Sequence, residues 1–392
     1  MHLSASLWRT MPMFRWLLLL LVLGAAVLGS LTVVKSPDWS QWRLAVLAGE
    51  FGHWIALVPL TIGLGAWVGR GSHAPLAGAT LGLGLLAVIL LLKPAVQAWR
   101  VAQSLPDKLR RQFGHVDLVR PAFSPIAFFN RALEPVHVET LAYLGDRLLD
   151  FYRPVRTDTQ AAPCVIVVHG GGWDSGDRGE IAPFNHWLAS RGYAVAAISY
   201  RLAPQFNWPA PRDDILAALA FLKARAVALG IDATRLVLLG RSAGGNLAEA
   251  TAYAAPDPAI RGVVALYAPA DMNFAYAWGR EDDVLKSPRL LRQFLGGTPE
   301  TVRAAYVDAS GYLHVDKHTP PTLLIHGELD TLVWNRQSER LDRKLSLAGV
   351  PHVLVSLPWA THAFEYNLSG PGGQLTTFAV EWFLAAVTRQ VR

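Results

Sequence analysis

The stretch RLVLLGRSAGG at residues 235–245 decides the fold, because it predicts a buried strand that enters a sharp turn and then a helix. Within it, residues 240–244 match the pattern G-x-S-x-G, which lifts a serine hydroxyl above the end of a sheet. Gly240 and Gly244 stand on the two sides of Ser242 because a side chain at these positions would collide with neighbouring backbone in so tight a turn. Ser242 is therefore the candidate nucleophile.

A second glycine-rich turn follows an apolar run upstream, in the sequence VIVVHGGGW at 165–173. Backbone N–H groups of Gly170–Gly172 can approach a developing negative charge closely, because no side chain intervenes. The N–H of Ala243, directly after the serine, completes such a set of donors. The two turns together predict a pocket for an oxyanion beside Ser242.

A serine hydroxyl reacts only when a base takes its proton, and an acid must hold that base in one tautomer. In the G-x-S-x-G architecture these partners follow in the order serine, acid, histidine. The sequences IHGELD at 325–330 and LPWATHAF at 357–364 each end a predicted strand in a loop. Asp330 and His362 are therefore the candidate acid and base, at the carboxyl ends of parallel strands where open α/β sheets place their sites.

Other side chains near these motifs compete for the same roles. Glu328 is the alternative acid, and we favour Asp330 because it lies further into the loop. His326 lies within the predicted strand and is interpreted as a core side chain. His352 begins a strand beside a proline and is expected to be exposed.

The second part of the chain alternates between apolar strands and helical patterns, which predicts a mostly parallel sheet with helices on both faces. The segment near 271–312 is a long insertion that is expected to form a lid over the site. Strands are expected at 148–152, 165–169, 193–200, 236–239, 260–267, 322–326 and 353–357, and helices at 181–191, 213–229, 243–255, 335–348 and 374–388.

The first part of the chain is unusually apolar and holds three uncharged runs, near 16–34, 51–68 and 75–92. A run of roughly 20 apolar residues crosses the hydrocarbon core of a bilayer, so these runs predict transmembrane helices. Burial as core helices is the alternative, more plausible for the second and third runs. We expect a membrane segment with a basic flank at 1–110, a linker at 111–134 and a catalytic domain at 135–392.

The formal net charge of +6 is concentrated in the first part of the chain. Residues 1–131 hold twelve Lys and Arg against four Asp and Glu, so they carry +8 and the remainder sums to −2. Because the second part has no basic stripe, a nucleic-acid partner is excluded. The single cysteine, Cys164, permits no internal disulfide.

The same charges predict an orientation in the membrane. With three spans, seven Lys or Arg lie on the side of the second domain and three on the opposite side. The positive-inside rule then favours a multi-pass protein of a bacterial-type inner membrane with a cytoplasmic catalytic domain. A cleaved signal peptide at the first run is the alternative, and it would leave two spans.

Several motifs occur in an order that resembles the α/β-hydrolase-fold esterases of the hormone-sensitive lipase and carboxylesterase group. The resemblance covers roughly residues 135–390 and leaves the membrane segment outside the shared fold. The motifs are HGGGW at 169–173, SYRLAP at 199–204, PAPRDD at 209–214, GRSAGGNLA at 240–248, HGELDTLV at 326–333 and THAF at 361–364.

This resemblance implies an α/β-hydrolase fold with a sheet of about eight strands, and a site without metal or cofactor. The site residues that it implies are Ser242 as nucleophile, Asp330 as acid, His362 as base, and Gly171, Gly172 and Ala243 as oxyanion donors. Arg241 stands where many lipase-like relatives have an aspartate, which is similar to a feruloyl-esterase-like or formamidase-like branch. Arg241 either orients a substrate or pairs with a carboxylate.

We expect a membrane-anchored serine hydrolase that cleaves carboxylic esters through an acyl-enzyme, with a small or lipid-like ester as substrate. The same triad would also serve an amidase, a formamidase or an acyltransferase. A catalytically silent membrane scaffold is the non-enzymatic alternative, and the filled catalytic positions argue against it.

Overall fold

An eight-stranded sheet forms the centre of the computed structural model, with the strand order β1-β2-β4-β3-β5-β6-β7-β8. The structure describes residues 12–129, 135–158 and 160–389. From β4 to β8 neighbouring strands are parallel, while β1 and β2 form an antiparallel edge. The strands are β1 Val138–Leu144, β2 Arg147–Tyr152, β3 Ala162–Val168, β4 Ala194–Ile198, β5 Ile231–Arg241, β6 Ile260–Leu266, β7 Thr322–Gly327 and β8 His352–Leu357.

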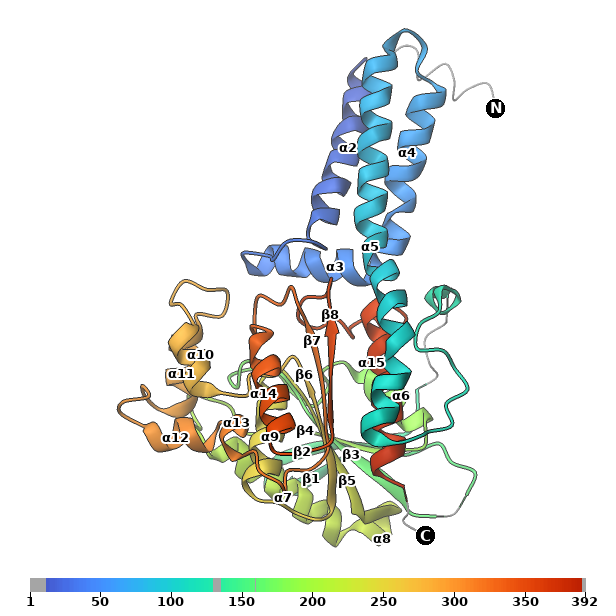
Figure 1. Cartoon of the computed structure of the whole chain (residues 1–392). Helices are drawn as coiled ribbons and strands as arrows, with labels where there is room; N and C mark the ends of the chain where they lie inside the picture. Colours follow the sequence, from blue (N-terminus) through green and yellow to red (C-terminus); the bar gives the residue numbers. More distant parts are fainter. Residues whose placement is uncertain (1–11, 130–134, 159, 390–392) are drawn as a thin grey trace.

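Helices cover both faces of the sheet because its strands are apolar on both sides (Figure 1). In β3, Val165 and Val167 pack in one hydrophobic cluster, and Cys164 and Ile166 pack in the other. The first cluster includes α6 Ala182–Ser190 and α15 Pro371–Val387, and the second includes α7 Ala210–Ala224, α9 Ala243–Ala254 and α14 Arg336–Leu347. A short helix, α8 Ala226–Leu229, precedes β5. The α/β-hydrolase fold expected from the motifs is confirmed.

The insertion expected near 271–312 lies between β6 and β7 and is mostly helical. It consists of α10 Met272–Trp278, α11 Ser287–Leu295, α12 Arg303–Asp308 and α13 Gly311–His314. Helices α10 and α11 stand at the same end of the sheet as the carboxyl ends of the strands (Figure 1). They are therefore positioned to wall a site at that end.

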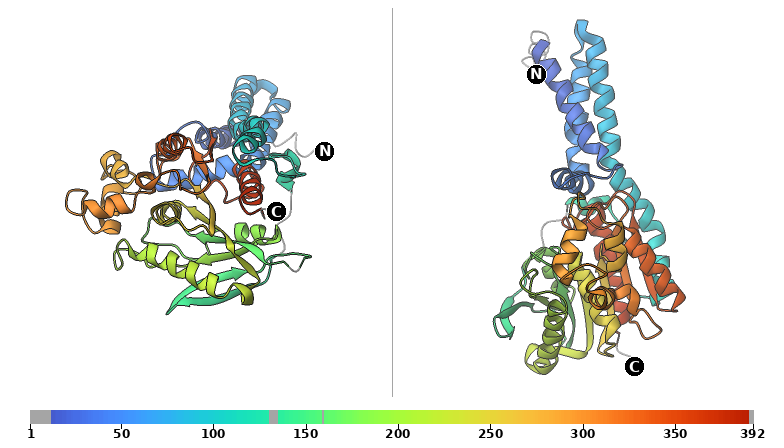
Figure 2. Two further views of the ribbon diagram at one scale, coloured as in Figure 1. Left: turned by 60° about the horizontal axis from the view of Figure 1, so that its bottom comes forward. Right: turned by 90° about the vertical axis from the view of Figure 1, so that its left-hand side faces the viewer.

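The first part of the chain forms a bundle that projects from the catalytic domain (Figures 1 and 2). It contains α2 Pro12–Ser30, α3 Trp39–Ile55, α4 Leu57–Val68, the short η1 Gly71–His73 and α5 Ala74–Phe113. Among the described residues, α2 and α5 are long and apolar enough to cross a membrane, and α3 with α4 would count as a third, broken span. Residues 1–11 of the predicted membrane segment lie outside the described part.

Two of the three predicted spans differ from the runs seen in the sequence. The run at 51–68 is divided between α3 and α4, whose axes differ by 52°. Helix α3 lies across the base of the bundle, between it and the catalytic domain (Figure 1). The run at 75–92 begins a much longer helix, because α5 continues through Pro94 and Pro106 to Phe113.

Helix α5 joins the two parts of the molecule instead of ending at the membrane. Leu105 and Leu109 are buried in the same cluster as α15. This burial stabilises the helix where each proline removes a backbone hydrogen bond. The boundary expected near residue 110 therefore falls inside α5. The linker begins after Phe113 and contains the short helix η2 Pro125–Phe129. Residues 130–134 of the linker lie outside the described part.

Candidate active site

Ser242 occupies the strained turn between β5 and α9. Its backbone has φ 51° and ψ −120°, a conformation that residues with side chains rarely adopt. The turn closes by tight contacts that exclude any side chain beyond glycine: a Cβ on Gly240 would lie 2.1 Å from the Gly244 carbonyl oxygen. The Ser242 N–H donates to the Leu266 carbonyl at 2.9 Å, which ties the turn to β6.

His362 and Asp330 meet in the loops that follow β8 and β7. His362 Nδ1 donates to Asp330 Oδ2 at 2.7 Å. The other oxygen, Asp330 Oδ1, accepts the N–H groups of Leu332 at 2.8 Å and Val333 at 3.0 Å. Burial by itself raises the pKa of the Asp330 carboxyl, but the attraction and hydrogen bonds of His362 and His326 outweigh it and lower that pKa. Asp330 is therefore held as a carboxylate.

The other acidic and histidine side chains near the motifs do not occupy the positions of Asp330 and His362. Glu328 is exposed, and in the described part of the chain no hydrogen bond or ion pair joins its side chain to His362. His326 is buried, as expected, and its Nε2 also lies 3.3 Å from Asp330 Oδ2. His352 is buried, contrary to expectation, because its ring donates to the Val350 carbonyl.

The hydroxyl of Ser242 and the ring of His362 line the same cavity, of about 430 Å³. No hydrogen bond joins them in the described part of this structure, and such bonds are commonly longer before substrate binds. The Tyr267 ring packs on the His362 ring with centroids 4.1 Å apart. Tyr267 itself has φ 43°, so a second strained residue supports the base.

The glycine turn at 170–172 lies directly beside the serine. A Cβ on Gly170 would be 3.4 Å from the Ser242 Cβ. The Gly170 N–H donates to Glu180 Oε2 at 2.8 Å, so this amide is already engaged. In the described part of the chain no protein acceptor takes the N–H groups of Gly171 and Gly172. These two amides are available to a ligand.

The backbone of this turn requires glycine. Gly171 has φ 102° and Gly172 has φ 61°. A Cβ on Gly171 would come within 2.2 Å of the Ser175 carbonyl oxygen. The buried His169 stabilises this turn. Its ring stacks on Tyr200, and its Nδ1 donates to the Gly170 carbonyl at 2.7 Å.

Arg241 does not point into the cavity, and of its two expected roles the structure supports pairing with a carboxylate. Its side chain is buried, and Nε donates to Glu365 Oε1 at 3.0 Å. The same Glu365 oxygen accepts the Tyr267 hydroxyl at 2.5 Å. Arg241 thus stabilises the loop that follows His362 and supports the ring that packs on it.

One feature of the cavity was not predicted from the sequence. Trp39 and Trp42, both from α3, line it together with Ser242 and His362. A smaller cavity of about 140 Å³ adjoins it under the insertion and shares the lining residues Leu285, Leu290 and Leu332. Its walls are aromatic, formed by Trp173, Phe274, Trp278 and Trp334.

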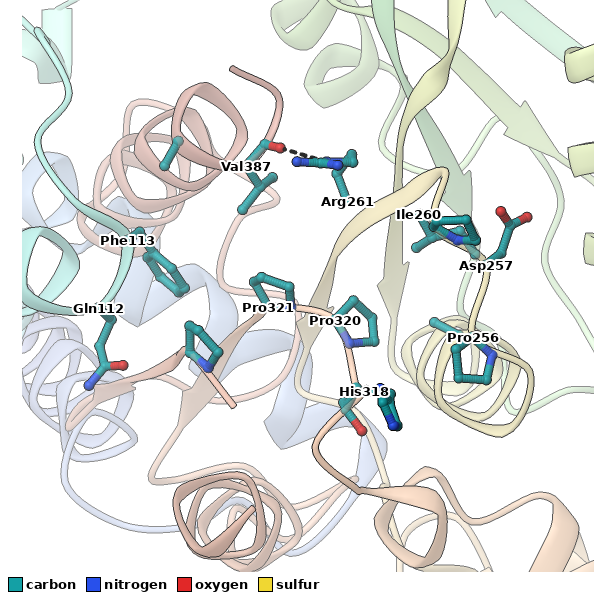
Figure 3. Close-up of a pocket in the computed structure, with 15 residues that line it drawn as sticks. Gln112, Phe113, Pro256, Asp257, Ile260, Arg261, His318, Pro320, Pro321 and Val387 are labelled. Carbon is teal, nitrogen blue, oxygen red and sulfur yellow. Dashed lines mark hydrogen bonds between the residues drawn. The ribbon is translucent and has the colours of Figure 1, made fainter. Parts of the chain in front are cut away.

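A larger hollow of about 550 Å³ lies at the opposite end of the sheet (Figure 3). It is lined by residues at the amino ends of β6 and β7, among them Arg261 and Pro321, and by Val387 at the end of α15. The candidate nucleophile and base are at the other end of the strands. This hollow is therefore not the site that the motifs predict.

The chain matches a known protein family and several known proteins. The BD-FAE family matches residues 149–345. A probable carboxylic ester hydrolase, LipM of Mycobacterium tuberculosis, is 32% identical over 61% of this chain and 58% of its own length. An ethyl acetate hydrolase of Pseudomonas putida is 31% identical over 66% of this chain and 82% of its own length.

Solved esterase structures share the fold. A bacterial heroin esterase has a TM-score of 0.57 and 26% identity, over 68% of this chain and 88% of its own. An esterase of Pyrobaculum calidifontis has a TM-score of 0.56 and 24% identity, over 74% and 94% of the two chains. The chain spans less than two thirds of the length of LipM. On these matches, the chain belongs to the BD-FAE family, within the α/β-hydrolase-fold esterases that its motifs resemble.

Proposed function

We propose that this chain is a membrane-bound serine hydrolase that cleaves carboxylic esters, with Ser242 as nucleophile, His362 as base and Asp330 as acid. The observation that carries the proposal is the 2.7 Å hydrogen bond from His362 to the buried Asp330, beside a strained serine in the same cavity. The names of the relatives, carboxylic ester hydrolase and ethyl acetate hydrolase, support the reaction class.

In the first half of the reaction, the Ser242 oxygen attacks the ester carbonyl and its proton passes to His362 Nε2. The carbonyl oxygen becomes negatively charged and accepts hydrogen bonds from the N–H groups of Gly171, Gly172 and Ala243. The intermediate collapses, the bond to the alcohol oxygen breaks, and the alcohol leaves with the proton from His362. The acyl group remains on Ser242.

In the second half, His362 takes a proton from water, and the resulting hydroxide attacks the acyl carbonyl. Collapse of this intermediate releases the carboxylic acid and returns the proton to Ser242. Asp330 stays ionised throughout, because its pKa is lowered by His362 and His326. It holds the His362 Nδ1–H in place and stabilises the cation that forms on the ring.

The reaction is tested on the purified full chain with p-nitrophenyl esters from acetyl to palmitoyl. We expect hydrolysis by the wild type and none above background by Ser242→Ala or His362→Ala. Hydrolysis by the Ser242→Ala variant at the wild-type rate would refute the proposal. Adding a short alcohol separates hydrolysis from acyl transfer, since an acyltransferase would yield the new ester.

We also propose that α2 and α5 anchor the enzyme in a membrane with the catalytic domain in the cytoplasm. Helix α3 lies at the end of the bundle nearest the catalytic domain, and the connection between α4 and α5 lies at the far end (Figure 1). Arg43 is in α3, Lys35 precedes that helix, and Lys93 donates to the Thr32 carbonyl just after α2, whereas Arg70 lies in the α4–α5 connection. The excess of positive charge is therefore on the catalytic side. A C-terminal reporter that is active only in the cytoplasm should be active, and activity of a periplasmic reporter instead would reverse the orientation.

A further inference from the structure

Helix α3 forms part of the wall of the candidate active site, although it belongs to the apolar first part of the chain. The carboxyl ends of the strands, where Ser242 and His362 lie, point toward α3 and the bundle (Figure 1). Trp39 and Trp42 of α3 line the same cavity as these two residues. Their indole rings pack edge to face, with centroids 5.3 Å apart. The cavity therefore opens next to the helices that could cross a membrane.

The position of α3 over the cavity is fixed by specific hydrogen bonds. Glu50 of α3 is buried, with 1% of its surface exposed. Its carboxylate accepts the N–H of Gly372 at 2.8 Å and the indole N–H of Trp359 at 3.3 Å, and its carbonyl accepts from Asn367 at 2.9 Å. Trp359 and Gly372 lie on either side of His362 in the chain. Helix α3 is thus bound to the loop that carries the candidate base.

The outer face of α3 is apolar and exposed, which is typical of a helix that lies in the headgroup region of a bilayer. Leu44 is 45% exposed, and Leu47 and Trp54 are each 40% exposed. Arg43 is exposed next to them. Lys93 also indicates where the membrane–water interface would lie along the bundle. Its ammonium group donates to the Thr32 carbonyl, just after the end of α2. With α2 and α5 in the membrane as proposed above, the mouth of the cavity lies at the surface of the hydrocarbon.

One side of the cavity suits a hydrocarbon chain, whereas Asp174, Glu180 and Lys286 line other parts of it. Val284, Leu285, Leu290 and Leu332 form its side toward the insertion, and the last three continue into the smaller cavity with aromatic walls. Moving an acyl chain from a bilayer into such a lining costs little, because both environments are apolar. Transfer of the same chain through water would cost free energy, because all of its apolar surface would be exposed.

We propose that the substrates are long-chain acyl esters dissolved in the bilayer, which reach Ser242 sideways past Trp39 and Trp42. The ester carbonyl then lies at the glycine turn. The acyl chain lies between the leucine side of the cavity and the two tryptophans of α3, and the alcohol group of the ester occupies the small aromatic cavity. This inference rests on the proposed ester hydrolysis and adds its substrate class and the direction of entry.

The test uses the full chain reconstituted in phosphatidylcholine vesicles. Two substrates are compared, a water-soluble p-nitrophenyl acetate and a fluorogenic hexadecanoyl ester incorporated in the membrane. The variants are Trp39→Ala, Trp42→Ala and the double variant, with Trp99→Ala as matched control, since Trp99 is an exposed tryptophan of α5 outside the cavity lining. Labelling with a fluorophosphonate counts the reactive sites in each sample, so that rates are expressed per competent enzyme.

We expect the ratio of kcat/KM for the hexadecanoyl ester over the acetate to fall about tenfold in the double variant, because two large apolar contacts to the chain are lost. The same ratio in Trp99→Ala should stay within about twofold of the wild type. A ratio in the double variant equal to that of the wild type would overturn the inference.

A second measurement needs no substitution. Wild-type enzyme and hexadecanoyl ester are placed either in the same vesicles or in separate vesicles that do not fuse. Sideways entry predicts much faster hydrolysis in the same vesicles, and equal rates would overturn it. The Ser242→Ala variant separates the two proposals. If this variant hydrolyses the acetate as fast as the wild type does, the proposed function is wrong. If the variant is inactive but the wild type gives equal rates in both vesicle arrangements, only the proposed route of entry is wrong.

Discussion

Replacing Asp330 with asparagine should stop turnover with little change in shape, because it alters which nitrogen of His362 carries a proton. The carboxylate of Asp330 faces donors only. The Nδ1–H of His362 donates to Oδ2, His326 Nε2 lies 3.3 Å from the same oxygen, and the N–H groups of Leu332 and Val333 donate to Oδ1. An asparagine side chain has one oxygen, which accepts hydrogen bonds, and one NH₂ group, which only donates them. Two backbone donors hold that oxygen at the Oδ1 position, so the amide faces His362.

The consequence for His362 can be followed from this geometry. Facing an amide N–H, His362 Nδ1 must accept, and the ring proton moves to Nε2. A ring protonated at Nε2 has no lone pair to take the proton of Ser242. In serine proteases the same change of tautomer lowers kcat by about 10⁴, or about 5.4 kcal/mol in the barrier, and we expect a loss of that order here.

The assay is steady-state hydrolysis of p-nitrophenyl butyrate by the purified wild type, Asp330→Asn and Glu328→Gln. Glu328 is exposed two positions before Asp330, so its variant is the matched control and should keep its rate within about twofold. Thermal denaturation of each sample shows whether the fold is kept. A loss of less than about tenfold in a folded Asp330→Asn, or a large loss in Glu328→Gln, would refute the assignment of the acid.

Three further predictions concern the turn, the buried ion pair and the response to acid. Gly171→Ala places a Cβ within 2.2 Å of the Ser175 carbonyl oxygen and displaces a candidate oxyanion donor, so kcat should fall about 10²–10³-fold, and an unchanged kcat would contradict it. Arg241→Met leaves the buried Glu365 without its cation and should lower the free energy of unfolding by about 3–5 kcal/mol. Adding Glu365→Gln should restore much of that loss in thermal denaturation, and no recovery in the double variant would argue against the pair. Burial lowers the pKa of His169 from 6.5 to about 4, so the unfolded chain binds the proton first as the pH falls. Stability should therefore decrease between about pH 6.5 and pH 4, by up to about 3 kcal/mol from this residue, and His169→Gln should have a flatter denaturation profile over that range.

The site could be predicted from the sequence to the extent that its chemistry lies in local motifs. Ser242 was identified because a strand, a small-residue turn and a helix follow one another in a short stretch. Asp330 and His362 were identified because both end an apolar strand, and parallel strands bring their carboxyl ends together. The choice of Asp330 over Glu328 followed from position in the loop, and the structure brings only Asp330 to His362.

Features that depend on contacts between distant segments could not be predicted in this way. Nothing near Trp39 or Trp42 in the sequence indicates that α3 lies against the cavity, because that contact depends on Glu50 meeting the loop after β8. His352 was expected to be exposed because it follows a proline, but its ring is buried and donates to the Val350 carbonyl in the turn before β8. The strand β1 was missed because its residues are largely exposed and pair only with β2 at the edge of the sheet.

The continuity of α5 was obscured by the same kind of tertiary effect. Pro94 marks a helix boundary by local rules, yet the helix continues to Phe113. Burial of Leu105 and Leu109 against the catalytic domain stabilises the second half of the helix. Such burial cannot be recognised without knowing which surface the helix meets.

Mapping the acyl-enzyme tests the proposed chemistry most directly. The purified chain is mixed with p-nitrophenyl butyrate, quenched in acid within the first turnovers, and digested for mass spectrometry. We expect a butyryl group on the peptide that contains Ser242, and no such adduct in Ser242→Ala. A butyryl group on another residue, or hydrolysis that continues in Ser242→Ala without any adduct, would contradict it.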